Sequence, residues 1–330
     1  MVSLDPSSDG ALVVTEVSAV PAEPPAHILY RHKARFLESV SQLWAHREII
    51  YTLAERDFRA QYKQAALGAM WAVLSPVATL VIFVVVFSHA KQLVKLPTNL
   101  PYALYAFVGI MCWNYFAGSL GSGGSSLLTN KALLAKTQFP RECFPLETML
   151  VQALNTLISF IPLTLLFVFF GRVPALASLW VPLFMVIEVA FAVGVTLTIS
   201  SLIIQMRDLV QVLPIMISLG LFVNPVIWPF SSIPSAYRIA GGHRVTHLVT
   251  HNGHTATVHQ IVGGLKINLQ MVYGFFNPLG PIIDSARRTM LLGLNPQWGL
   301  IGVAALGALL YLSFGYKIFK RFEVNFADIA

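Results

Sequence analysis

The sequence predicts an all-α membrane protein with six transmembrane helices and both termini on the cytoplasmic side, and three observations support this prediction. First, 56% of the 330 residues are hydrophobic and only 11% are charged, whereas a soluble domain has about 25% charged residues. Second, uncharged stretches long enough to cross a bilayer recur along the chain. Third, Lys and Arg concentrate in alternate connecting segments. Without a dense basic stripe, this composition also argues against nucleic acid as a partner.

The residues before the first apolar stretch fall into two parts. Residues 1–30 are rich in Pro, Ser and Ala and lack the apolar core of a signal peptide, which predicts a disordered cytoplasmic tail. Residues 31–65 contain seven Lys or Arg, and apolar residues such as Leu43, Ile50 and Phe58 recur at helical spacing. We predict an amphipathic helix along the membrane surface, with a solvated helix of a small cytoplasmic domain as the alternative.

Residues 66–230 hold the first five predicted spans, and residues 297–330 hold the sixth with a cytoplasmic C-terminus. The first candidate, 67–87, has 21 uncharged residues, which at about 1.5 Å each cover a hydrocarbon core of about 30 Å. The other candidates are 102–127, 148–170, 177–204, 209–229 and 297–316. The second is the weakest, because GSLGSGG thins out its end. We interpret these glycines as helix-packing residues, since the chain has no Walker phosphate loop.

The distribution of Lys and Arg sets the predicted orientation. With the N-terminus inside, the cytoplasmic segments carry fourteen of these residues and the outer segments carry eight, five of them in one long loop. Basic residues favour the cytoplasmic side, and long loops count little toward this rule. An even number of spans then places both termini inside.

Residues 231–296 form the long extracytoplasmic loop of this prediction. In its stretch HRVTHLVTHNGHTATVH (243–259), β-prone residues flank Asn252-Gly253, a pattern typical of a two-residue β-hairpin. Such a turn places His251 opposite His254, where the pair could share a metal, although a solvated hairpin without metal is preferred. The stretch FFNPLGPIIDSARRTMLLG (275–293) is apolar but too short and too charged to span. We therefore predict short re-entrant helices before the last span.

Glu188 is the one acidic residue deep within a predicted span. An ionisable group inside the bilayer is costly and marks a candidate functional site. It could bind a proton in a proton-coupled carrier, line a polar conduit, or form a hydrogen bond to a neighbouring helix. An interfacial enzyme acting on lipid-linked sugars is a weaker alternative, because the other acidic residues are scattered.

Five short motifs follow one another along the chain. They are RDFRAQYKQAALGAMWAVLSP (56–76), NKALLAKTQFPRECFPL (130–146), Arg207-Asp208, NPVIWP (224–229) and NP…ARR…LLG (277–293). In this order they resemble the membrane subunits of type-2 ABC exporters of polysaccharides, the permeases for O-antigen, teichoic acid and capsule. The resemblance extends over residues 36–325.

The resemblance implies a permease that moves a lipid-linked polysaccharide across the bacterial plasma membrane. It also implies a homodimer in contact with membrane lipids and with two copies of a separate ATP-binding subunit. ATP and Mg²⁺ would bind to that subunit, so the chain itself would carry no cofactor and no catalytic residue. An exporter of a small lipid or drug on the same fold is the alternative within this class.

The cytoplasmic motifs are the predicted contacts with the ATP-binding subunit. The loop 130–142 is short, and Lys136 and Arg141 could pair with acidic residues of a partner. Arg207-Asp208 is expected as a second contact, with a local ion pair as the alternative. The residues assigned to coupling are Asn130, Leu133, Lys136, Phe139, Pro140, Arg141, Glu142, Arg207 and Asp208. On the interface helix, Arg56, Asp57 and Tyr62 match the family pattern.

The outer ends of the predicted spans are rich in aromatic residues. Aromatic rings anchor helices at the membrane interface, and they can also present apolar faces to a passing sugar. The resemblance implies that the short outer helices gate the exit. The residues assigned to the substrate path and gate are Tyr102, Tyr105, Phe107, Trp228, Phe230, Phe275, Phe276, Asn277 and Pro278.

Overall fold

The computed structural model of the chain describes residues 41, 43–63, 68, 70–88, 100–136, 140–235, 237–240, 243–251, 254–262 and 265–323. The chain divides into two units, Met1–Trp44 and Ala45–Ala330, and every element below belongs to the second. The tail predicted at 1–30, residues 31–40 of the predicted surface helix, and the Asn252-Gly253 turn lie outside the described residues.

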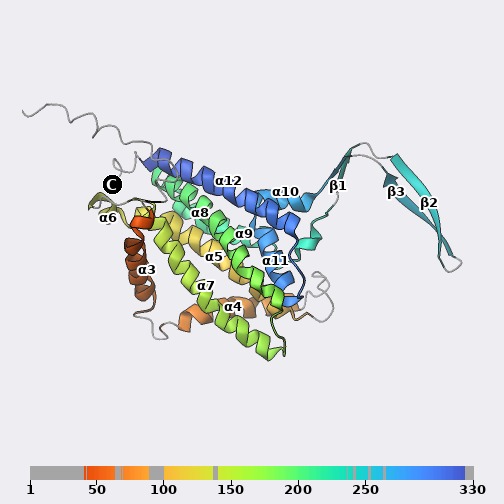
Figure 1. Cartoon of the computed structure of the whole chain (residues 1–330), viewed down its shortest axis with the longest axis horizontal. Coiled ribbons are helices and arrows are strands. Elements are labelled where there is room, and N and C mark those ends of the chain that lie inside the picture. Colours follow the sequence, from red (N-terminus) through yellow and green to blue (C-terminus); the bar gives the residue numbers. More distant parts are fainter. Residues whose placement is uncertain are drawn as a thin grey trace, which may run out of the picture. The chain divides into compact units, whose positions relative to one another are not determined.

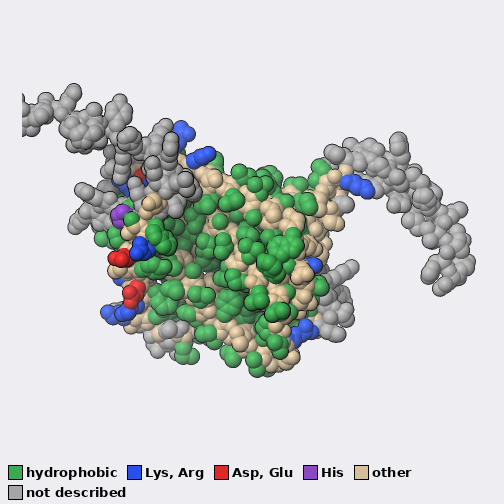
Figure 2. Space-filling model, in the orientation of Figure 1, with side chains coloured by type: hydrophobic (Ala, Val, Ile, Leu, Met, Phe, Trp, Pro, Cys, Tyr) green, Lys and Arg blue, Asp and Glu red, His purple; other side chains and the backbone are tan. Residues whose placement is uncertain are grey.

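Four helices among the described residues are long and apolar enough to cross a membrane. They are α5 (Tyr102–Thr129), α7 (Cys143–Phe169), α8 (Val181–Gln205, preceded by the 3-10 turn η1, Leu176–Trp180) and α12 (Trp298–Phe322). α5 packs against α7 and α8, and α12 packs along α8 (Figure 1). The face in Figure 2 is covered largely by hydrophobic side chains, with charged groups toward the margin. The predicted helical membrane fold is confirmed at this level.

The two remaining predicted spans are shorter helices. α4 (Met70–Ser88) has 19 residues and α9 (Leu209–Val223) has 15. At about 1.5 Å per residue they extend about 28 and 22 Å, below the roughly 30 Å of a hydrocarbon core. The prediction that the fifth helix reaches residue 229 is wrong. Asn224 caps α9 by donating its backbone and side-chain N–H groups to the Gly220 carbonyl, at 3.0 and 2.8 Å.

α5 is the centre of the packing, although its glycines and serines made it the weakest span by hydropathy. It is the most buried of the four long helices. A Cβ added at Gly118 would lie 2.6 Å from Gln152 Oε1 of α7, and one at Gly123 would lie 2.5 Å from Thr196 Cγ2 of α8. The interpretation as packing residues is therefore confirmed for Gly118 and Gly123, whereas a Cβ at Gly121 would make only an ordinary contact, 3.5 Å from Ile217 Cδ1. Low hydropathy here reflects close helix contact rather than exposure to water.

The contact between α8 and α12 also depends on glycine. A Cβ on Gly315 would overlap the backbone of Gly194, and a Cβ on Gly194 would overlap the backbone at Tyr311 and Leu312. Two helix backbones can approach this closely only where neither carries a side chain. The crossing fixes α12 on α8 midway along both helices.

Shorter helices flank the long ones. They are α3 (Arg47–Tyr62), α6 (Lys131–Lys136), α10 (Leu269–Phe276) and α11 (Leu279–Leu291), with a 3-10 turn η2 (Phe230–Ser232). α3 has Ala54 as its one buried residue and packs on α7. α10 and α11 are the short helices predicted before the last span, and Asn277-Pro278 separates them.

Two antiparallel strand pairs lie between α9 and α10. β1 (Tyr237–Ala240) pairs with β4 (Leu265–Ile267), and β2 (His243–His251) pairs with β3 (His254–Val262). The register places His251 opposite His254, so the predicted hairpin and its register are confirmed.

Candidate functional site

The predicted coupling segment begins where α5 turns into α6. Asn130 donates its backbone and side-chain N–H groups to the Ser126 carbonyl, and its own carbonyl accepts the N–H groups of Leu133 and Leu134. Leu134 packs with Phe144 of α7. Lys136 is the last residue of α6, while Phe139 lies outside the described residues. One asparagine therefore ends α5 and starts α6 in a fixed direction.

Two further residues of this segment point inward rather than toward a partner. Glu142 is 1% exposed and forms an ion pair with Lys320 near the end of α12. The Lys320 ammonium also lies 3.0 Å from the Glu323 carboxylate, and Arg141 donates to the Glu323 backbone carbonyl. We call Arg141, Glu142, Lys320 and Glu323 the inner clamp. It joins the start of α7 to the end of α12, and sequence reasoning missed its α12 half.

The second predicted contact, Arg207-Asp208, has a different geometry. Both side chains are exposed in the turn between α8 and α9. None of the ion pairs among the described residues joins them. The alternative of a local ion pair is not supported, and both charges are open to a partner surface.

The motif on the interface helix docks α3 onto α7. Arg56 Nε donates to Asp57 Oδ1 at 2.7 Å, which raises the pKa of the Arg56 guanidinium. Both side chains lie within electrostatic range of Glu147, which is fully buried at the start of α7. One turn further on, the Tyr62 hydroxyl donates to Asn155 Oδ1 at 2.8 Å. Of these three residues, Tyr62 joins α3 to α7 by a hydrogen bond, while Arg56 and Asp57 pair with each other on α3.

At the opposite ends of α5 and α12, a network of amides and hydroxyls joins α9 to the hinge between α10 and α11. Asn277 Nδ2 donates to Asn224 Oδ1 and to the Tyr273 hydroxyl, both at 2.8 Å. The Tyr273 hydroxyl donates to the Val223 carbonyl at 3.0 Å. The predicted gate residue Asn277 therefore connects the end of α9 to α10.

Arg287 of α11 was given no role from the sequence alone. Near the first residues of α5 and α12, its guanidinium nevertheless forms three hydrogen bonds to backbone carbonyls. It is 2% exposed and donates to the carbonyls of Tyr105 at 2.9 Å, Pro225 at 2.6 Å and Val226. Its guanidinium also lies 3.7 Å from the centre of the Tyr105 ring. The carbonyls of 225 and 226 are free because α9 has ended. Five fixed N–H donors suit a guanidinium to such a cage.

The aromatic residues assigned to the substrate path divide by burial. Phe107 is fully buried in the core. Tyr105 and Phe230 are buried but line a cavity beside α11, described below. Phe276 is exposed, whereas Tyr102, Phe275 and Trp228 are half-buried, and the Trp228 indole donates to the Phe222 carbonyl at 3.0 Å.

Glu188 lies where α8 faces α5 and α11. It is 3% exposed, and its Oε1 atom has no hydrogen-bond partner among the described residues. It lines a cavity of about 10 Å³ together with Cys112 and Thr156. That volume holds roughly one water molecule. A cavity of that size is too small for an open conduit past Glu188.

These features define an integral membrane protein whose described helices are joined at both ends by charged and polar contacts. Comparison with known proteins gives the family. The profile described as "ABC-2 type transporter" matches residues 48–242. The chain belongs to this family.

Individual relatives extend the match beyond the family profile. The chain is 25% identical over 285 residues to the O-antigen export system permease protein RfbA of Klebsiella pneumoniae, covering 86% of this chain and 95% of the relative. It is 26% identical over 195 residues to the protein of the same name from Myxococcus xanthus, covering 59% of this chain and 73% of the relative.

Proposed function

We propose that this chain is the permease subunit of an ATP-driven exporter that moves a lipid-linked polysaccharide across the bacterial plasma membrane. The observation that carries the proposal is the similarity, over nearly its whole length, to a permease named for O-antigen export. The chain works as a homodimer with two copies of a separate ATP-binding subunit. That subunit binds ATP and Mg²⁺ and carries out hydrolysis, so this chain is not itself an enzyme.

The proposal includes six spans with both termini inside, and the grouping of loops supports this topology. The inner clamp brings together two predicted cytoplasmic segments, the start of α7 and the end of α12. At the other ends of the helices, Leu100 and Asp284, which belong to predicted outer segments, line one cavity with Phe230 and Gln297, which stand at the outer ends of predicted spans. α4 and α9 supply the remaining spans.

Energy from the ATP-binding subunit would enter through α6 and the turn at Arg207-Asp208. α6 continues directly from α5, and the inner clamp ties the next helix, α7, to α12. At the outer side, Arg287 ties α5 to α11. A displacement of the cytoplasmic loops is thereby carried along packed helices to the short outer helices that gate the exit.

The test is purification with the ATP-binding protein encoded beside this chain, followed by measurement of ATPase activity. Arg207→Glu reverses an exposed charge of the proposed contact, and Lys266→Glu, an exposed charge on β4, is the matched control. We expect the first to weaken the complex or uncouple its ATPase activity and the second to leave both unchanged. A chain that binds no ATP-binding protein would refute the proposal.

The topology has its own measurement. A cysteine introduced by Arg207→Cys should react with a membrane-impermeant maleimide only after the cells are opened. One introduced by Lys266→Cys should react in intact cells. The opposite pattern would overturn the orientation.

A further inference from the structure

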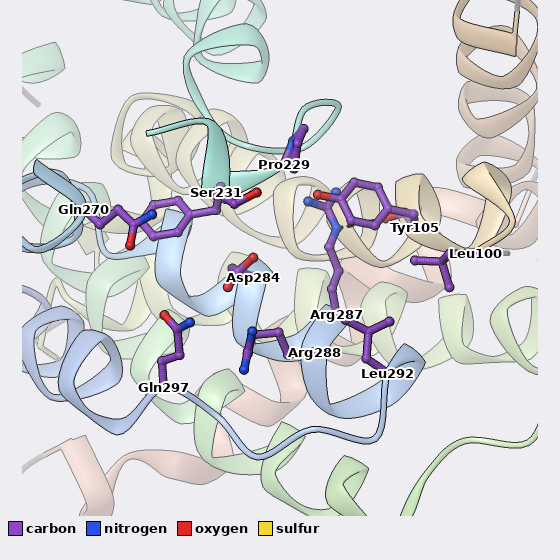
Figure 3. A pocket seen from close by; sticks show the side chains of 11 residues that line it. Leu100, Tyr105, Pro229, Ser231, Gln270, Asp284, Arg287, Arg288, Leu292 and Gln297 are labelled. Atoms are coloured by element: carbon purple, nitrogen blue, oxygen red, sulfur yellow. Dashed lines mark hydrogen bonds between the residues drawn. The ribbon is translucent and has the colours of Figure 1, made fainter. Parts of the chain in front are cut away.

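A cavity of about 350 Å³ lies beside α11 (Figure 3). Its walls come from the residues before α5 and α12, from the segment 229–231, from α10 and from α11. Small-molecule sites have volumes of roughly 300–1,000 Å³, so the cavity is large enough for a ligand of modest size.

Two polar groups of this cavity have no partner among the described residues. Asp284 and Arg288 lie on successive turns of α11 and both line the cavity (Figure 3). The Arg288 Nε atom is buried and has no hydrogen-bond partner among the described residues. No hydrogen bond or ion pair of the described residues involves the Asp284 carboxylate, and burial raises its pKa while Arg287 and Arg288 oppose that rise. A buried donor such as Arg288 Nε requires a partner, and the half-buried Asp284 carboxylate lines the same cavity, so both groups favour a polar occupant.

The other residues that line the cavity indicate which chemical groups the occupant would carry. Gln270 donates its amide N–H to the Ile233 carbonyl at 2.8 Å, which leaves its amide oxygen to accept, and Gln297 adds a second carboxamide. The Phe230 and Tyr105 rings add apolar surface. Arg287 is already held by backbone carbonyls, so one carboxylate and one guanidinium remain to be satisfied.

This combination fits a neutral sugar. Sugar hydroxyls donate to a carboxylate and accept from a guanidinium, while the C–H face of the ring packs on aromatic side chains. A phosphate would satisfy Arg288 but would leave the Asp284 carboxylate beside a second anion, and an acyl chain would satisfy neither group.

We propose that this cavity, at the outer ends of α5 and α12, binds one neutral sugar unit of the exported glycan. The inference rests on the proposed function. It adds to that function a binding site that holds the glycan as it leaves the exporter.

The test places a photo-crosslinking amino acid, p-benzoylphenylalanine, at Leu292 in cells that export the glycan. Leu292 lines the cavity, whereas Leu309 is an exposed leucine of α12 outside it and serves as the matched control. We expect glycan adducts at position 292 and none at 309. If export requires the chain but position 292 captures only lipid or nothing, the sugar site is refuted. If export does not depend on the chain, the proposed function itself fails.

Two further variants test the polar groups. Asp284→Asn and Arg288→Gln keep the shape but weaken the bonds to a sugar, so each should lower the adduct yield at position 292 roughly tenfold. Glu55→Gln, on the exposed face of α3, should leave the yield unchanged. Methyl glycosides added to the purified complex should compete with the glycan for this cavity and so lower the yield of glycan adducts at position 292. An unchanged yield in both folded variants would overturn the inference.

Discussion

The inner clamp makes a measurable prediction about stability. Lys320→Met removes the partner of a carboxylate whose side chain is only 2% exposed, while Lys320 itself is 26% exposed. Removing one member of a buried ion pair costs about 3–5 kcal/mol, and the partial exposure of Lys320 favours the lower end, about 3 kcal/mol. Glu142→Gln leaves Lys320 its second partner, Glu323, at 3.0 Å, so the expected cost is about 1 kcal/mol.

The double variant separates this explanation from general damage. With Gln at 142 and Met at 320 no carboxylate at position 142 is left without its cation, and only the Glu323 carboxylate, 12% exposed, loses Lys320. The two substitutions together should therefore cost about 2 kcal/mol rather than the roughly 4 kcal/mol of their sum. The assay is the free energy of unfolding of the purified chain, measured by SDS titration in mixed micelles. Effects that add to within about 0.5 kcal/mol would mean that the two side chains do not interact, and the clamp would be refuted.

The same unfolding assay tests three further contacts. Arg287→Met removes the donors to three backbone carbonyls and should lower the free energy of unfolding by about 3 kcal/mol or more. A loss below about 1 kcal/mol would contradict the proposed cage. Gly315→Ala should cost about 1–3 kcal/mol through overlap with α8, whereas Gly302→Ala on the same helix meets no atom within 4 Å and should be nearly neutral. Tyr62→Phe removes the bond to α7 and should cost about 0.5–1.5 kcal/mol, while the exposed Tyr51→Phe should change nothing; equal effects would show that the hydroxyl is irrelevant.

The helices and the hairpin were predictable because their causes are local. Bilayer thickness sets the length of an apolar stretch, so the predicted and observed bounds of the second span, 102–127 and 102–129, agree closely. The turn sequence sets the register of a hairpin, which is why the pairing of His251 with His254 could be foreseen. The end of α9 could also have been predicted, since Pro225 lacks the N–H that a helix needs.

The contacts that organise the candidate sites were not predictable, because each depends on residues far apart in the sequence. Glu142 was interpreted as a contact for a partner, but its ion pair is with Lys320 of the last helix. Arg287 was counted as a loop charge and as part of the motif at 277–293 but was given no role, since nothing local indicates that three carbonyls will surround it. α5 was underrated because mean hydropathy does not register glycines that pack against other helices.

The central claim, export of a lipid-linked polysaccharide, is tested most directly by surface glycan in cells from which this chain has been deleted. We predict that the glycan disappears from the surface and accumulates inside on its lipid carrier, and that the wild-type chain restores it while a chain unable to bind the ATP-binding subunit does not. Normal surface glycan without the chain would contradict the account.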